Sequence, residues 1–246
     1  FHLKGINISK KDYQDGPLED WTKGALQFNG KDQYAICPND TLSKTFSYTI
    51  KFRWDEKGRT EDRTITGKEF KSPQVYDSNF LIEAYFKTGL KFTEGLLVEK
   101  IDGAGYSLDV NKSGGVTFTV KGGGKTLKLS SSVTINDGKW HHIIAEADRN
   151  SKTLTLYING KKDKEGPGLA TGISLENKAD LYVGGTPSGR YFNGTFEFLR
   201  ICLGTLADAK TDIDELYAWE FDGPFLRDFT GREAKGRRDA GALEKK

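Results

Sequence analysis

The sequence predicts an all-β protein built as an antiparallel sandwich of two sheets. Three observations predict this class: apolar and polar residues alternate over many short runs, turn signals separate the runs, and one run recurs about every 8–12 residues. The 29 glycines against 6 prolines, together with 12% aromatic residues, fit many short strands joined by glycine turns. A chain of 246 residues is long enough to bury one large core.

Each strand is predicted from a run with a period of two. In the first clear run, residues 48–54, Tyr48, Ile50 and Phe52 share one face, while Lys51 and Arg53 lie on the other. The later runs are FLIEAYF, GYSLDV, GVTFTV, TLKLS, WHHIIAEA, TLTLYI, ADLYVGG and FEFLRICL. The turn signals between them are NKSGG, KGGGK, NDGK, DRNSK, NGKK and TPSG.

Three segments depart from this pattern. Near the C-terminus, TDIDELYAWEF predicts one short helix, with Asp212 as N-cap and Glu215 at the spacing of a capping box. Residues 231–246 are basic and poor in large apolar side chains, which predicts a loosely held tail. Residues 55–79 form a long charged segment, and we expect either a functional loop or a surface insertion such as an extra hairpin.

Composition argues against several classes of partner. The 37 basic and 35 acidic residues are interspersed and leave a net charge of only +2, so we expect no nucleic-acid partner. No apolar run approaches the roughly 18 residues of a membrane span, and no signal peptide is visible. The chain begins at Phe1 and contains no methionine, so we expect a processed protein or an excised fragment, compatible with a removed export signal.

Adjacent histidines, His141 and His142, invite the hypothesis of a metal or acid–base site. Neighbouring side chains on a strand point to opposite faces, so the run WHHIIAEA separates the two rings. We therefore predict that they are part of the architecture and do not share an ion.

The segment 136–161 also resembles the laminin-G-like branch of the concanavalin A-type jelly rolls, through DGKWHH at its start and TLTLYINGK at its end. Three further segments match in order: ALQFNGKDQYAIC, GLLVEKIDGAGYSLDVNKSGGVTFTV and FNGTFEFLRICLGTLADAKTDIDELYAWE. The matches run from about Ala25 to Glu220. The resemblance implies a jelly-roll domain over residues 25–230, preceded by a lead-in segment, 1–24, and followed by the tail, 231–246.

Within such a domain, Trp140 and Tyr157 are predicted to fill the interior of the sandwich. Asn159 and Gly160 suit the two positive-φ positions of a hairpin turn.

The resemblance places the first and last strands side by side, which would bring Cys37 near Cys202. By alternation both side chains would leave the core on its outer side. Two alternatives stay open, a disulfide in an exported protein and two unpaired thiols.

A structural calcium ion is common in this superfamily. Its oxygen ligands would come from Asn29, the carbonyl of Gly30 and Asp32, with Glu197 from the closing strand. Relatives often carry an aspartate at the position of Glu197.

A ligand-binding surface is predicted on one face of two strands. Tyr85 and Lys87 share a face with Glu83, as Lys51 and Arg53 do in their own run. If these faces belong to one sheet, they form a cationic and aromatic surface beside the long segment with Arg59 and Arg63. Such a surface favours carboxylated or sulfated glycans, and the alternative is an ordinary polar face.

Evidence for catalysis is weak. No strand carries the paired carboxylates of the glucanases in this superfamily. RTEDR and YFKTG resemble two motifs of the alginate-lyase jelly rolls and would nominate Arg59, Arg63 and Tyr85 for β-elimination, but the third motif of that family is missing.

The sequence therefore predicts a non-catalytic, lectin-like domain that binds an acidic or sulfated polysaccharide. We expect it to be secreted or exposed at the cell surface, and to form part of a larger polysaccharide-processing protein. The alternatives are a polysaccharide lyase on the same fold and a protein-binding adhesion domain.

Overall fold

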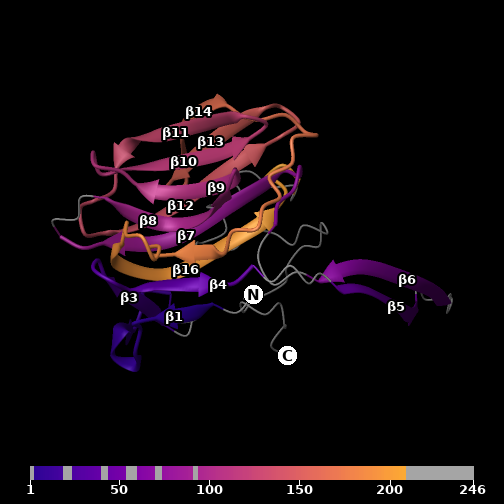
Figure 1. Ribbon diagram of the computed structural model, residues 1–246, viewed down its shortest axis with the longest axis horizontal. Helices are drawn as coiled ribbons and strands as arrows, with labels where there is room; N and C mark the ends of the chain where they lie inside the picture. Colours follow the sequence, from indigo (N-terminus) through magenta and orange to yellow (C-terminus); the bar gives the residue numbers. More distant parts are fainter. Residues whose placement is uncertain are drawn as a thin grey trace.

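The computed structural model describes residues 3–18, 24–39, 44–53, 60–69, 74–90 and 94–208, and for 44–53 and 60–69 it describes the backbone alone. Two seven-stranded antiparallel sheets dominate this part of the chain and stack into a sandwich (Figure 1). The predicted fold class is confirmed. Within these residues the structure contains no helix with the length and apolar character that a membrane crossing requires.

The first sheet has the strand order β1-β4-β15-β8-β9-β10-β11. Its strands are β1 (Lys4–Ile6), β4 (Tyr34–Cys37), β15 (Leu181–Val183), β8 (Gly95–Asp102), β9 (Ala104–Val110), β10 (Gly115–Gly122) and β11 (Lys125–Thr134). Strands β8 to β11 are successive hairpins, whereas β15 comes from far along the chain and is inserted between β4 and β8.

The second sheet has the order β14-β13-β12-β7-β16-β3-β2. Its strands are β14 (Lys161–Pro167), β13 (Thr153–Ile158), β12 (Trp140–Asp148), β7 (Phe80–Thr88), β16 (Asn193–Leu203), β3 (Ala25–Asn29) and β2 (Tyr13–Gln14). A single turn of 3-10 helix, Lys10–Asp12, precedes β2.

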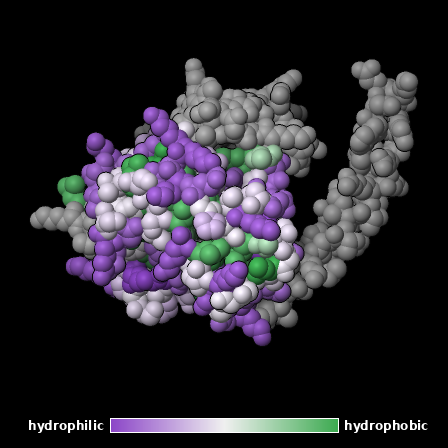
Figure 2. All heavy atoms as spheres, turned by 90° about the horizontal axis from the view of Figure 1, so that it is seen from above, coloured by the Kyte–Doolittle hydropathy of each residue, from purple (hydrophilic) through white to green (hydrophobic). Residues whose placement is uncertain are grey.

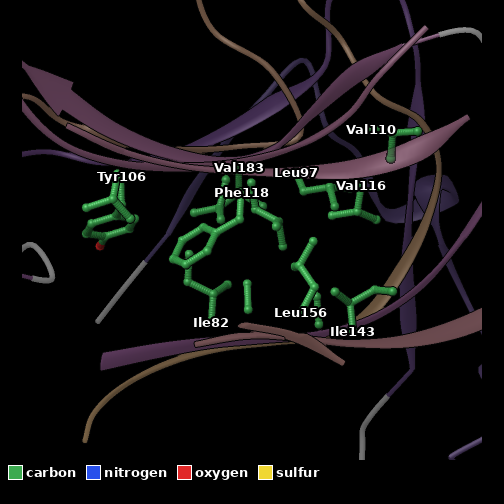
Figure 3. Close-up of a cluster of buried hydrophobic side chains, with 14 of the residues drawn as sticks. Ile82, Leu97, Tyr106, Val110, Val116, Phe118, Ile143, Leu156 and Val183 are labelled. Carbon is green, nitrogen blue, oxygen red and sulfur yellow. The ribbon is translucent and has the colours of Figure 1, made fainter. Parts of the chain in front are cut away.

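The core lies between the two sheets and is built by alternation. On β7, Phe80, Ile82, Ala84 and Phe86 point inward and are completely buried. Figure 3 shows Leu97, Phe118 and Val183 of the first sheet facing Ile82, Ile143 and Leu156 of the second. Burying side chains of this size contributes about 1.5–3 kcal/mol each, so the inter-sheet core is the main source of stability.

The outer surfaces are mixed in polarity. Among the residues that Figure 2 colours, hydrophobic ones form small patches between hydrophilic ones on the face shown. Individually exposed apolar residues of this kind are normal on a protein surface.

The turn between β13 and β14 is confirmed. Asn159 and Gly160 have φ values of 49° and 78°, and Ile158 pairs with Lys161 across them. Two successive positive φ values define the type I′ geometry, which matches the twist of the two strands.

The described part of the N-terminal segment contributes two strands to the sandwich. β1 pairs with β4 at the edge of the first sheet, and β2 pairs with β3 at the edge of the second. The predicted helix near Asp212 and the tail, 231–246, lie outside the described residues.

The expected proximity of the cysteines is wrong. Cys37 lies in β4 of the first sheet, whereas Cys202 lies in β16 of the second, and no disulfide joins them. Cys37 points into the core beside Ala35, contrary to prediction, because Tyr34 and Ile36 occupy the outer side of this short strand. Cys202 does leave the core and packs with Leu81 and Ile144 on the outer face.

The run 48–54 also differs from expectation. It lies within and just beyond β5 (Lys44–Arg53), which pairs only with β6 (Thr60–Glu69) among the described strands. Neither strand belongs to a seven-stranded sheet. Among the described strands, β5 and the sheet that carries Tyr85 are therefore separate. An extra hairpin, one of the two alternatives for the charged segment, is present over part of it.

Candidate functional site

The candidate site is a group of three partly exposed side chains on the outer face of the second sheet. Tyr85 of β7 and Trp140 of β12 stack with ring centroids 5.2 Å apart and planes 19° from parallel. The ammonium group of Lys87 lies 5.1 Å from the centroid of the Trp140 ring. We call Tyr85, Lys87 and Trp140 the aromatic–lysine patch.

Strand register builds this patch. Trp140 is opposite Lys87, and His142 is opposite Tyr85, so the two rings are diagonal neighbours on one face. Diagonal partners on antiparallel strands are within reach of aromatic side chains. Stacking and the cation–π contact each add about 0.5–1.5 kcal/mol, which orders the three side chains before any ligand arrives.

A buried ionic network lies next to the patch in the same sheet. Glu83 is fully buried, and its carboxylate is 2.8 Å from Nε2 of His142. It also accepts hydrogen bonds from Nε and Nη2 of Arg200, at 3.2 and 2.5 Å. Burial by itself would raise the pKa of Glu83, but the charge of Arg200 and the contact with His142 outweigh it and lower the pKa. Glu83 is therefore ionised, and its charge is neutralised within the sheet.

The phenol of Tyr85 stays protonated at neutral pH. Burial, and then the negative charge of Glu197, raise its pKa. A phenol in this state donates and accepts hydrogen bonds but is a poor general base. The phenol can therefore serve a ligand as a hydrogen-bond donor and acceptor.

The structure brings together two of the predicted ligand-binding residues, Tyr85 and Lys87. Lys51 and Arg53 lie on β5 and Arg63 on β6, and the described part of the chain does not include their side chains. Arg59 lies outside the described residues.

Trp140 is the site residue that sequence reasoning missed. It was assigned to the sandwich interior, yet it lies on the outer face, as does Tyr157, which packs beside Leu81 and Ile144. The signal was present in the alternation, because Trp140 shares its parity with the polar His142 and Glu146. Ile143, the inward residue between them, belongs to the core.

The two histidines do face opposite ways, as predicted. Nε2 of His141 is 2.9 Å from Asp137, and its Nδ1 is 3.0 Å from the side-chain amide of Asn159. His142 instead contacts Glu83 on the outer face. Both rings hold structural hydrogen bonds.

The proposed calcium ligands do not converge. Asn29 pairs with Asn193 at one end of β3, whereas Glu197 follows Phe196, the partner of Leu26, at the other end. The carboxylate of Glu197 accepts a 2.7 Å hydrogen bond from the backbone N–H of Leu18. The register thus separates Glu197 from the loop that contains Asn29, Gly30 and Asp32.

The side chains of Asn29 and Asp32 are engaged in hydrogen bonds within and beside their loop. The amide nitrogen of Asn29 donates to one carboxylate oxygen of Asp32 at 2.7 Å, and that of Asn7 donates to the other at 3.2 Å. The side-chain oxygen of Asn29 accepts from the backbone N–H groups of Lys31 and Asp32. These oxygens are directed at N–H donors, so the loop is closed by its own hydrogen bonds.

The fold and the patch together define a class: an antiparallel jelly-roll sandwich that presents aromatic and cationic side chains on a sheet face. Residues 29–210 match the family described as the concanavalin A-like lectin/glucanases superfamily, and the chain belongs to this family.

Human laminins are among its relatives. The chain is 35% identical to laminin subunit alpha-3 over 79 residues, covering 31% of this chain and 2% of that protein. It is 27% identical to laminin subunit alpha-1 over 151 residues, covering 57% and 5%. The chain thus corresponds to a small fraction of these proteins.

Two solved structures are similar to this chain, and the first of them supports the fold. The HCR/D F1240A mutant superposes with a TM-score of 0.54 at 10% identity, covering 88% of this chain and 46% of that one. Domains LG4-5 of the mouse laminin alpha1 chain give a TM-score of 0.48 at 14% identity, covering 74% and 42%.

Proposed function

We propose that the protein is a non-catalytic carbohydrate-binding domain that recognises an acidic or sulfated polysaccharide through the aromatic–lysine patch. The observation that carries the proposal is the stacked Tyr85–Trp140 pair with the Lys87 ammonium held over the indole. Membership of a lectin and glucanase superfamily supports it.

The chemistry of the patch suits such a ligand. The C–H faces of a sugar ring pack against flat aromatic side chains, whereas the ring hydroxyls need polar partners. The Lys87 ammonium, held beside the aromatic pair, would pair with a carboxylate or sulfate on the sugar. The charge of Arg200 is already neutralised by Glu83, so Lys87 supplies the selectivity for acidic chains.

The laminin relatives support a secreted or cell-surface location, and the small fraction of each that this chain covers supports a module of a larger protein. Within that protein, we propose that the domain holds a polysaccharide for processing by other parts of the chain.

Affinity electrophoresis in gels containing alginate, polygalacturonate or chondroitin sulfate tests the proposal. The protein should be retarded by at least one of them. W140A should weaken binding about tenfold, because the indole provides stacking area for the sugar and holds the Lys87 ammonium in place through the cation–π contact. K87Q should weaken binding to the acidic polymer while leaving the aromatic surface in place. K125Q, at an exposed lysine on β11 in the other sheet, is the matched control and should bind as the original protein does.

Three results would contradict the proposal. A product absorbing in the ultraviolet, formed from a polyuronate, would establish the lyase alternative. Absence of retardation in every acidic gel would overturn the acidic specificity, and failure across a full glycan array would favour the protein-binding alternative.

A further inference from the structure

A second group of aromatic side chains lies on the outer face of the first sheet. Tyr34 of β4 is 6.1 Å from Tyr182 of β15 and 6.4 Å from Tyr191, measured between ring centroids. All three rings are partly exposed. We call these three residues the tyrosine platform.

Alternation directs the platform away from the core. On β4, Ala35 and Cys37 belong to the inter-sheet core, so Tyr34 lies on the opposite side. On β15, Leu181 and Val183 belong to the core, so Tyr182 also faces outward. β15 lies directly beside β4, which brings together tyrosines that are far apart in the sequence.

The loop before β16 is shaped to hold Tyr191. Gly185 has a φ of 148°, and a Cβ there would lie 2.6 Å from Cδ1 of the Tyr191 ring, so only glycine permits this approach. Arg190 has a positive φ of 57°, and its carbonyl accepts a 2.8 Å hydrogen bond from the N–H of Leu96. Backbone strain of this kind persists where surrounding contacts fix it, and it is concentrated at functional sites.

An ion-paired group of charged side chains borders the platform. Arg190 donates to Asp109 at 2.9 Å and forms an ion pair with Glu99, which is opposite Tyr182 in the sheet. Burial raises the pKa of Asp109, and its contacts with Ser107 and Arg190 oppose the increase. Arg190 is thus already paired with two carboxylates and is not free to bind a sulfate, and these groups offer hydrogen-bond partners to sugar hydroxyls. Thr117 and Ser130 continue the same face on β10 and β11, beside the exposed Lys128.

We propose that the tyrosine platform is a separate binding site for a neutral, β-linked polysaccharide in its single-chain form. Equatorial substituents leave flat C–H faces on β-linked glucose units, which fit partly exposed tyrosine rings. The ring planes are tilted by 58° and 31°, so they match successive sugars of a twisted chain and not the flat surface of a crystalline polymer. The inference goes beyond the acidic site of the other sheet and does not depend on it.

Affinity electrophoresis in gels of laminarin, hydroxyethylcellulose and xyloglucan tests this site. At least one neutral polymer should retard the protein, and Y182A and Y191A should each weaken that binding about fivefold or more. Y182L, which keeps an apolar side chain without a flat ring, should lose binding while the thermal unfolding midpoint stays near that of the original protein. Y13A is the matched control, because Tyr13 is exposed on β2 in the other sheet.

The two sites are distinguished by testing each variant against both neutral and acidic polymers. W140A should bind neutral polymers normally, and Y182A should bind acidic polymers normally. Absence of retardation by all neutral polymers, or loss of neutral binding in W140A with none in Y182A, would overturn the inference. Binding to microcrystalline cellulose as strong as to the soluble chains would contradict the single-chain specificity.

Discussion

Glu83 is the centre of the ionic network on the outer face of the second sheet. Its carboxylate is fully buried and is held by Arg200 and His142. A buried ion pair is weak evidence for stability as a pair, yet removing one partner leaves the other charge uncompensated. The position of Glu83, directly beside Tyr85 on β7, links this charge balance to the site.

We expect E83Q to lower the free energy of unfolding by about 2 kcal/mol, below the usual range for a fully buried pair, because Arg200 is partly exposed. Urea denaturation measures the change. E165Q is the matched control, since Glu165 pairs with Lys162 at the surface and its loss should cost less than about 0.5 kcal/mol.

The stability difference between the original protein and E83Q should depend on pH. Because the folded-state pKa of Glu83 is lowered from 4.5, its stabilisation is complete above the unfolded pKa and is lost as the pH falls through the folded value. The stability difference between the original protein and E83Q should therefore be largest at neutral pH and shrink below about pH 4. A difference that does not change with pH would contradict an ionised Glu83.

Arg149 plays the corresponding role for a loop. The guanidinium is buried and donates through Nε to the carbonyl of Leu169 and through Nη2 to those of Ala170 and Ile173, at 2.6 to 2.9 Å. Burial lowers its pKa, and the charge of Asp77 opposes this effect. One side chain thus holds the irregular connection between β14 and β15 against the end of the sandwich.

We expect R149M to destabilise the protein by about 3 kcal/mol, because one buried and two partly buried carbonyls lose their donor. Amide hydrogen exchange should accelerate first at Thr171 and Leu175, whose N–H groups bond to Arg149 and Tyr76. R149K should recover part of the stability. Unchanged exchange over 169–175 in R149M would show that other contacts hold the loop.

At the scale of strands, alternation predicted where the strands lie better than it predicted which side chains point into the core. The run FLIEAYF became β7 with the expected inward and outward sets, and the run WHHIIAEA separated its histidines as predicted. On β4 the pattern failed, because Tyr34 and Ile36 are apolar by type while the small Ala35 and Cys37 fill the core. Residue type alone does not distinguish an aromatic ring exposed for binding from one that packs inside.

Irregular pairing limited the prediction in another way. β16 shifts register between Phe196 and Phe198, and this bulge directs Glu197 toward the segment around Gly16 and Leu18. A strict period of two contains no information about such a shift. Alternation alone therefore could not predict where Glu197 lies relative to the loop that contains Asn29 and Asp32.

For the whole molecule, the sequence predicted the class of fold but only part of either site. Tyr85 and Lys87 are two residues apart on one strand, so alternation was enough to group them. Tyr34, Tyr182 and Tyr191 come together only because β15 is inserted between β4 and β8. That insertion is a property of the complete topology, and no local pattern indicates it.

The N-terminal strands have a practical consequence for anyone who shortens this chain. A version cut to the family boundaries, 29–210, would lack β1, β2 and most of β3, and would leave unpaired backbone along β4 in one sheet and β16 in the other. Such bare strand edges recruit other chains, so we expect this version to collect in inclusion bodies, whereas one that starts at residue 3 should stay in the supernatant after lysis. The amount of each version in the pellet and in the supernatant tests this expectation, and gel filtration shows whether the soluble protein is aggregated. The boundary chosen for expression would then determine whether any glycan experiment can be run.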